Sequence, residues 1–520
     1  MNELTRVLVI GADAADVDLI DRWGAAGDLP NLMALRKRAA YGRTENPHGM
    51  VSGSVWPAFH VGAMPGDQPQ YDAMRFFNPE RYTFDFYQAN QVSEPIWSQL
   101  SKAGKRCFVM DAPYTHLDPN INGVCIVDWS SHVPSLGTGV LELKASPPSA
   151  AQEILDLVGP DPAHGVMCDD RLCETIADYK HFIGQHLDRI EKKGRVAQHF
   201  LKKGGWDYFE ICFSDLHCMG HHLWHINDPG HPRYREDFEK ALGEPLRDGY
   251  RAIDRAVGEL LKLVDDRTLV VFFGSHGMGP QYTGTGLLDR VLYNLEHGIK
   301  TEGSGRTFKG RLRALWRSIP PDVRAAMMPV KKHFGGTLLH STFVDDRAHR
   351  KFFEVYVDNS EGGVRLNLKG REAQGIVDPK DAEALLKWIS DELVKVVNVD
   401  SGEPLVQEVV RVSEHYHGPH LGHLPDLTIM WNKSHPIRAV ASPTIGVLAQ
   451  EYADARTGDH KPDGLFIAAG GGVKAGALNH KVSVIDFVPT FRAVLGVAQG
   501  AGDGAVISAI TPAATHRVSA

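Results

Sequence analysis

Four histidines lie within nine residues in the segment "HCMGHHLWH" at 217–225. His217 and His221 are four residues apart, so on a helix their rings share one face, with Cβ atoms roughly 5–6 Å apart. Two imidazoles in that arrangement can chelate one metal ion, as the two histidines of a zinc protease helix do. His225 continues the same stripe. The alternative, from the residues alone, is a polar helix that is rich in histidine.

Three further residues that can bind a metal ion lie at or near the ends of apolar runs. Asp13 follows the run "VLVIGA", His276 follows "TLVVFFGS", and His460 comes shortly before "GLFIAAG". A lone histidine beside a strand usually satisfies a backbone carbonyl. Several such positions that converge on one place favour a metal site instead.

Five apolar runs predict strands that are buried on both faces. They span 6–13, 106–113, 208–215, 268–277 and 463–470. Helical patterns lie between them, as at 254–266, so the alternation predicts an α/β fold, a doubly wound and mostly parallel sheet with helices on both faces. Such sheets bind ligands at the carboxyl ends of their strands. The expected ends carry Asp13, Asp111, Asp215, Ser275 and His276.

The segment 296–343 interrupts this alternation, because it is basic and rich in glycine. We expect it to be an inserted lid or a solvated insertion, with a discontinuous α/β core formed by 1–295 and 344–520. The chain of 520 residues has a net charge of -8 and no basic stripe, which argues against nucleic-acid binding. No apolar stretch approaches a membrane span. The six cysteines show no disulfide-scaffold spacing, and we expect a cytoplasmic protein.

Six segments together resemble the alkaline phosphatase superfamily, in its type I phosphodiesterase/nucleotide pyrophosphatase branch. They are "VLVIGADAADVDLIDRW", "LPNLMALRKRAAYGRTENP", "VWPAFHVGAMPGDQP", "GHHLWH", "FFGSHGMGP" and "GDHKPDGLFIAAGGGV". Their order matches the family, and they cover the chain from residue 7 to about 473. The resemblance implies two metal sites, usually zinc, that hold a phosphate ester beside a Ser or Thr nucleophile.

The resemblance assigns roles to particular residues. Asp13 matches the metal ligand after the first strand, and His221 and His460 match the two histidines of one metal site. His276 matches the histidine of a Ser-Asp-His-Gly motif at the other site. The nucleophile should precede "WP", where this chain has Val55, so Ser54 is the expected nucleophile and Ser52 the other nearby hydroxyl. A plain helix-capping serine explains Ser54 equally well.

Two departures from the family reduce the carboxylate ligands. His217 stands where the family has Asp, and Ser275 replaces the Asp of the Ser-Asp-His-Gly motif. Carboxylates normally offset the repulsion between two close divalent ions. We therefore expect one firm site at His217, His221 and His460, with zinc or else manganese. A second site at Asp13 and His276 is weak or absent, unless Asp215 and Asp459 complete it.

The expected function is metal-dependent hydrolysis of phosphate esters, with a phosphodiester or a nucleotide pyrophosphate as substrate. The attacking group is a serine or a metal-bound hydroxide. Sulfate-ester hydrolysis is disfavoured, because no Cys or nearby Ser begins the C-x-P-x-R or S-x-P-x-R motif of sulfatases. The alternative from another class is a non-catalytic metal- or ligand-binding protein on the same fold. The partner is a small phosphate ester, and the sequence does not indicate an oligomeric state.

Overall fold

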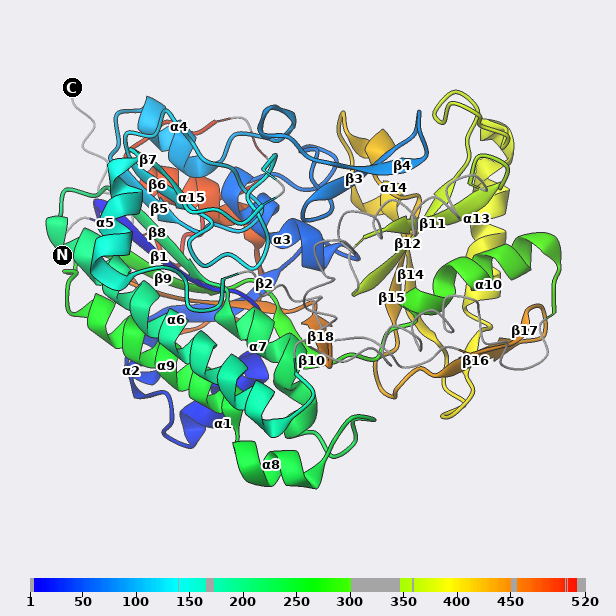
Figure 1. The fold of residues 1–520 in the computed structure, drawn as a ribbon. Coiled ribbons are helices and arrows are strands. Elements are labelled where there is room, and N and C mark those ends of the chain that lie inside the picture. The colour runs from blue at the N-terminus through cyan, green and yellow to red at the C-terminus, as the bar shows by residue number, and fades with distance from the viewer. Residues whose placement is uncertain are drawn as a thin grey trace.

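The computed structural model describes residues 4–138, 140–164, 173–300, 347–357, 360–449, 456–500, 502 and 504–511. The larger part of the protein is built on a ten-stranded sheet (Figure 1). In spatial order its strands are β20 (Gly476–Ala477), β2 (Ala40–Glu45), β19 (Gly464–Ala469), β9 (Thr268–Gly274), β1 (Arg6–Ala12), β8 (Tyr208–Phe213), β5 (Cys107–Met110), β6 (Gly123–Val127) and β7 (Lys144–Ser146). The tenth strand, β21 (Val482–Ser483), pairs with β2.

The five apolar runs of the sequence form β19, β9, β1, β8 and β5, which are adjacent strands of this sheet. Four of these, β9, β1, β8 and β5, run parallel to one another, and β6 is parallel to β5. Strand β19 is antiparallel to both β9 and β2, and β7 is antiparallel to β6. The prediction of a mostly parallel sheet is therefore confirmed.

Helices cover both faces of the sheet. In β1, Leu8 and Ile10 join one hydrophobic cluster while Val7 and Val9 join another, because successive side chains of a strand point to opposite faces. The first cluster takes in α1 (Val17–Ala25), α2 (Pro30–Lys37), α5 (Ser149–Val158), α6 (Ile176–Lys203), α7 (Asp215–Leu223), α8 (Glu236–Leu242) and α9 (Pro245–Leu261). The second takes in α3 (Val51–Val61), α4 (Ile96–Lys102) and α15 (Phe487–Val494). This is the doubly wound arrangement that the sequence predicts.

A second unit lies beside the large sheet, on the right in Figure 1. Its antiparallel sheet has the order β11 (Phe352–Tyr356), β12 (Glu361–Leu366), β15 (Leu427–Trp431) and β14 (Val406–Arg411). The unit also contains α10 (Thr285–His297), α13 (Pro379–Leu393), α14 (Val412–His415), β13 (Val397–Asn398), β16 (Ala439–Ser442) and β17 (Gly446–Ala449). Leu288, Leu366, Ile389 and Trp431 are among the residues of its own buried cluster. The insertion predicted at 296–343 falls, beyond residue 300, outside the described residues.

One short antiparallel ribbon joins the two units. The chain leaves the large sheet through β10 (Gly277–Pro280) and returns through β18 (Gly458–Lys461), and these two strands pair with each other. The remaining short elements are the hairpin β3 (Arg75–Asn78) and β4 (Thr83–Phe86) and the 3₁₀ turns η1 (Ala89–Gln91), η2 (Trp224–Ile226), η3 (Leu421–His423) and η4 (Val484–Asp486). Within the described residues, no helix has the length and apolar character that a bilayer crossing requires.

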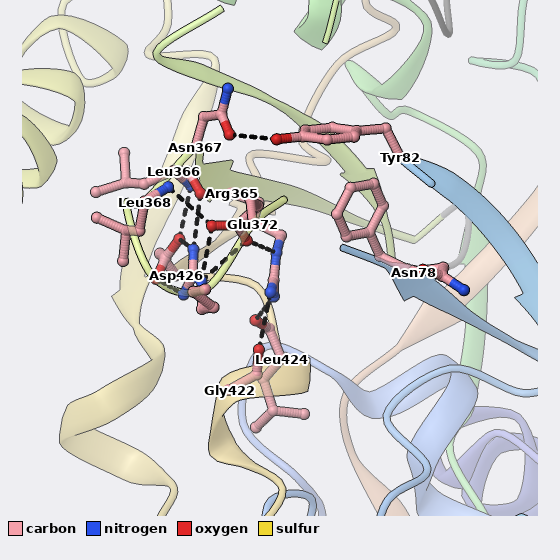
Figure 2. Close-up of polar contacts among 12 residues, drawn as sticks. Asn78, Tyr82, Arg365, Leu366, Asn367, Leu368, Glu372, Gly422, Leu424 and Asp426 are labelled. Carbon is pink, nitrogen blue, oxygen red and sulfur yellow. Dashed lines mark hydrogen bonds and ion pairs between the residues drawn. The ribbon is translucent and has the colours of Figure 1, made fainter. Parts of the chain in front are cut away.

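A buried arginine ties together three segments of the second unit (Figure 2). Arg365, in β12, is 1% exposed. Its guanidinium donates to the Glu372 carboxylate at 2.7 Å and to the carbonyl oxygens of Gly422 at 2.8 Å and Leu424 at 2.7 Å. Strand β12, the turn that follows it and the segment around η3 are thus held by one side chain.

We expect Arg365→Ala to lower the free energy of unfolding by about 3 kcal/mol, because it removes one member of a buried ion pair and leaves two carbonyl oxygens without their donor. Urea-induced unfolding measures this. The control is Lys387→Ala, which removes an exposed ion pair with Asp391 and should cost less than about 0.5 kcal/mol. Equal effects of the two variants would contradict the role given to Arg365.

Candidate metal centre

The ribbon between the two units positions two of the predicted ligands. In its register Met278 pairs with His460, and His276 directly precedes β10. The ring centroids of His276 and His460 are 4.0 Å apart. Since β19 is antiparallel to β9, the start of β19 lies at the edge where β9 ends. This is why a histidine that precedes a strand meets one that follows a strand.

Helix α7 begins directly after β8 and is buried throughout. The rings of His217 and His221 share one of its faces, with their Nε2 atoms 3.3 Å apart. A close approach of β18 to α7 depends on Gly458, because a Cβ there would lie 2.3 Å from the carbonyl oxygen of Gly220. That approach brings the carbonyl oxygen of Gly458 within 2.7 Å of His221 Nδ1.

Two overlapping groups could each hold a metal ion among the described residues. The ligand atoms of His217, His276 and His460 lie within 4.8 Å of one another, and so do those of Asp13, His132 and His217. His132 is a residue that the sequence analysis missed. It lies between β6 and β7, and its ring centroid is 4.3 Å from that of His217. The signal was its position soon after an apolar strand, as for Asp13 and His276.

The ring orientations suit metal ligation. The Nδ1–H groups of His221 and His276 can donate to the backbone carbonyls of Gly458 at 2.7 Å and Gly277 at 3.1 Å, which leaves each Nε2 with a lone pair. Metal-bound histidines usually make such a second hydrogen bond. The Nε2 atom of His460 and the Oδ2 atom of Asp13 are buried without a hydrogen-bond partner among the described residues. Buried polar atoms of this kind are expected to face a ligand.

Burial also fixes the charge of the histidines. Loss of hydration lowers the pKa of His217, His221 and His460 well below the ordinary imidazole value, and the charges of neighbouring histidines and of Arg456 add to the effect. The rings are therefore neutral at pH 7, which is the form that binds metals.

Of the predicted carboxylates in the described chain, Asp13 alone shares a candidate ligand group with the histidines. Asp13 accepts hydrogen bonds at Oδ1 from Trp56 Nε1 at 2.8 Å and from Ser275 Oγ at 2.7 Å, which leaves Oδ2. Asp215 accepts at Oδ1 from His186 Nδ1, in α6, at 2.9 Å, and its Oδ2 has no hydrogen-bond partner among the described residues. Asp459 pairs with Lys433. The charge offered by these residues therefore suits one divalent ion better than two close ones.

The structure separates the two candidate nucleophiles. Ser52 is the second residue of α3, fully buried, and its hydroxyl contacts His460 Nδ1. The hydroxyl of Ser54 donates to the carbonyl oxygen of Met50, the residue that precedes α3. Of these two serines, Ser52 therefore has the described contact with the histidine group.

A small pocket, with room for about one water molecule, adjoins the histidine group through His132. Asp111, Tyr114, Asp128 and Ser135 are among its lining residues. Asp111, Tyr114 and Asp128 are three of the five non-glycine residues with positive φ in the described chain, at 52°, 59° and 62°. Such strained backbone gathers at functional sites. Burial raises the pKa of Asp128 to about 7.

Comparison with known proteins identifies the family. The model of the type I phosphodiesterase / nucleotide pyrophosphatase family matches residues 7–457, and the chain belongs to this family. The protein is thus a member of a family of phosphodiesterase and pyrophosphatase hydrolases in the alkaline phosphatase superfamily, which confirms the predicted class. No curated protein sequence matches the chain.

Several solved structures are similar in fold. Phosphonoacetate hydrolase from Sinorhizobium meliloti 1021, in complex with phosphonoformate, is 12% identical with a TM-score of 0.49, over 95% of this chain and 96% of that one. Murine ectonucleotide pyrophosphatase / phosphodiesterase 5, in complex with AMP, is 10% identical with a TM-score of 0.49, over 96% and 97%. The human form of the latter is 12% identical with a TM-score of 0.48, over the same shares.

We expect His217→Ala to lose about one tightly bound zinc ion per chain, because His217 belongs to both ligand groups and each neutral imidazole nitrogen donates one lone pair. Native mass spectrometry of protein purified without chelators counts the ions. The exposed His435→Ala is the control and should keep the wild-type count. A wild-type count in His217→Ala would show that the groups do not hold the metal.

His225 continues the helical stripe but has a structural role. Its Nε2 lies 3.2 Å from the Tyr179 hydroxyl and its Nδ1 3.1 Å from the Thr457 hydroxyl, and burial lowers its pKa to about 3. An unfolded histidine takes up a proton near pH 6.5. Between about pH 6.5 and 3 the unfolded chain therefore binds more protons at this residue, and the free energy of unfolding falls as the pH falls.

We expect His225→Gln to lose less stability than the wild type between pH 7 and 5, even though its stability at pH 7 is lower. Urea unfolding at the two pH values in the presence of a chelator measures the difference. The exposed His480→Gln should keep the wild-type pH dependence. A pH dependence that is the same in all three proteins would exclude His225 as a source of acid destabilisation.

Proposed function

We propose that the protein is a metal-dependent hydrolase of phosphate esters, phosphodiesters or nucleotide pyrophosphates, with Ser52 as its nucleophile. The observation that carries the proposal is the contact of Ser52 with His460 inside a buried histidine group. Ser52 also lies in the first turn of α3, which has eleven residues. The free backbone N–H groups and the dipole of such a helix end favour a phosphate anion.

The ligand chemistry suggests the metal. His217, His276 and His460 would hold one ion, with Asp13, His132 and His221 beside them. Imidazole and carboxylate groups suit zinc, and manganese is the second choice. When bound, the ion would supply positive charge that polarises the phosphoryl oxygen.

The chain's own residues perform the remaining steps. The Ser52 oxygen forms a bond to phosphorus as the bond from phosphorus to the leaving oxygen breaks, and the proton lost by Ser52 ends on the leaving oxygen. Water then hydrolyses the phosphoserine, which restores the Ser52 hydroxyl and releases the phosphate product. In an in-line displacement the leaving group departs on the side opposite the nucleophile.

The compartment is also proposed. The five described cysteines are free and buried, which is consistent with a reducing compartment such as the cytoplasm.

The two serines give a direct test. We expect Ser52→Ala to lower kcat by at least about 1000-fold on bis(p-nitrophenyl) phosphate with zinc or manganese supplied, because the covalent step needs its oxygen. Ser54→Ala is the matched variant in the same helix and should lose far less. The reverse order would support Ser54 as the nucleophile, and equal activity in both variants would favour a solvent nucleophile.

A further inference from the structure

The carboxylate of Asp13 is held at one of its two oxygens by a pair of hydrogen-bond donors. Asp13 directly follows β1 and is fully buried. Its Oδ1 atom accepts from Ser275 Oγ at 2.7 Å and from Trp56 Nε1 at 2.8 Å. These two donors occupy the lone pairs of Oδ1, whereas Oδ2 is buried without a hydrogen-bond partner among the described residues. One oxygen of this candidate ligand is thus bound to the protein, and the other is left for a cation.

Ser275 reaches Asp13 because their strands are neighbours in register. Ala12 pairs with Gly274 where β1 runs parallel to β9, so the residues that follow the two strands lie side by side. The Ser275 hydroxyl donates its proton to Asp13, and its oxygen accepts from the backbone N–H of Ala14 at 3.2 Å. Ala14 has a φ of 58°, which is a strained conformation for a residue with a Cβ. Ser275 therefore holds both the carboxylate of Asp13 and the strained turn behind it.

Trp56 links the same carboxylate to the helix of the proposed nucleophile. It lies four residues after Ser52 in α3, so the two side chains share one helical face. Its indole packs against β1 at Gly11, where a Cβ would lie 2.8 Å from the Cη2 atom of Trp56. Because Gly11 has no side chain, the indole can approach the strand closely enough for its Nε1 to reach Asp13.

We propose that Ser275 and Trp56 are positioning residues that orient Asp13 as a metal ligand through its Oδ2 atom. The ligand atom of Asp13 lies within 4.8 Å of those of His132 and His217. Metal ligands are commonly fixed by hydrogen bonds from residues that do not touch the ion. Because both donors bind Oδ1, they hold the carboxylate in one rotation and leave Oδ2 for the ion. The inference rests on the metal site of the proposed function, since the orientation of Asp13 matters only if it binds the ion.

The test measures the zinc Kd of the full chain by competition with a chromophoric chelator, and the absorption spectrum of the cobalt-substituted protein. Ser275→Ala and Trp56→Phe each remove one donor to Asp13. We expect both to raise the zinc Kd about 10- to 100-fold and to alter the d–d bands of bound cobalt, because a carboxylate that can rotate changes the coordination of the ion. Ser275→Thr keeps the hydroxyl and should retain an affinity close to that of the wild type.

Two matched variants serve as controls. Trp97→Phe makes the same change at another fully buried tryptophan of the same hydrophobic cluster, whose Nε1 has no hydrogen-bond partner among the described residues. Ser130→Ala removes a buried hydroxyl that donates at 3.0 Å to Asp111, a carboxylate outside both ligand groups. Both controls should keep the wild-type zinc Kd and cobalt spectrum.

A wild-type Kd and cobalt spectrum in both Ser275→Ala and Trp56→Phe would overturn the inference while the proposed function stands. A raised Kd with an unchanged cobalt spectrum would indicate general support of the site, and it would also overturn the orienting role. Wild-type zinc affinity in Asp13→Asn would exclude Asp13 as a ligand, with the same consequence. If the wild type binds zinc but hydrolyses no ester, the proposed hydrolysis fails, and the metal measurements still decide the inference by themselves.

Discussion

The antiparallel pairing of β10 with β18 is the constraint on which the site depends. It joins the segment that enters the second unit to the segment that leaves it. It also places His276 and His460 side by side, although 183 residues separate them. The strand β19 that follows is inserted antiparallel into an otherwise mostly parallel sheet. That reversal returns the chain to the edge where Asp13 and α7 already lie. Without it, the late histidine would enter the sheet at the opposite edge.

The sequence indicates the central sheet well, because its strands are short continuous apolar runs. Each of the five predicted runs is a strand, and they are neighbours in space. Pairing partners are harder to predict, since they depend on contacts between distant segments. Nothing in "LPDLTIMW" distinguishes β15, which pairs in the small sheet, from a strand of the large one. The residues of β19 likewise do not indicate that this strand runs antiparallel to its neighbours.

The sequence predicted the residues of the site where their spacing or a motif indicated them, as for His217 and His221 on one helical face. His132 escaped because it lies in a loop, with no periodic relation to any other histidine. The choice between Ser52 and Ser54 could not be made from the motif, since it depends on where α3 begins and which face meets β18. The contact between Ser360 and Ser52 had no local signal in the sequence. It arises from the packing of two units, which no single segment encodes.

The ligand set spans nearly the whole chain, from Asp13 near the start to His460 near the end. During synthesis the early ligands leave the ribosome long before the late ones exist. A nascent chain that lacks β18 has Asp13, His217 and His276 but cannot assemble the group around His460. Metal binding by the group of His217, His276 and His460 would therefore follow synthesis of β18. A product truncated before residue 458 would retain most of the sheet's strands and the group of Asp13, His132 and His217, while lacking the group that includes His460.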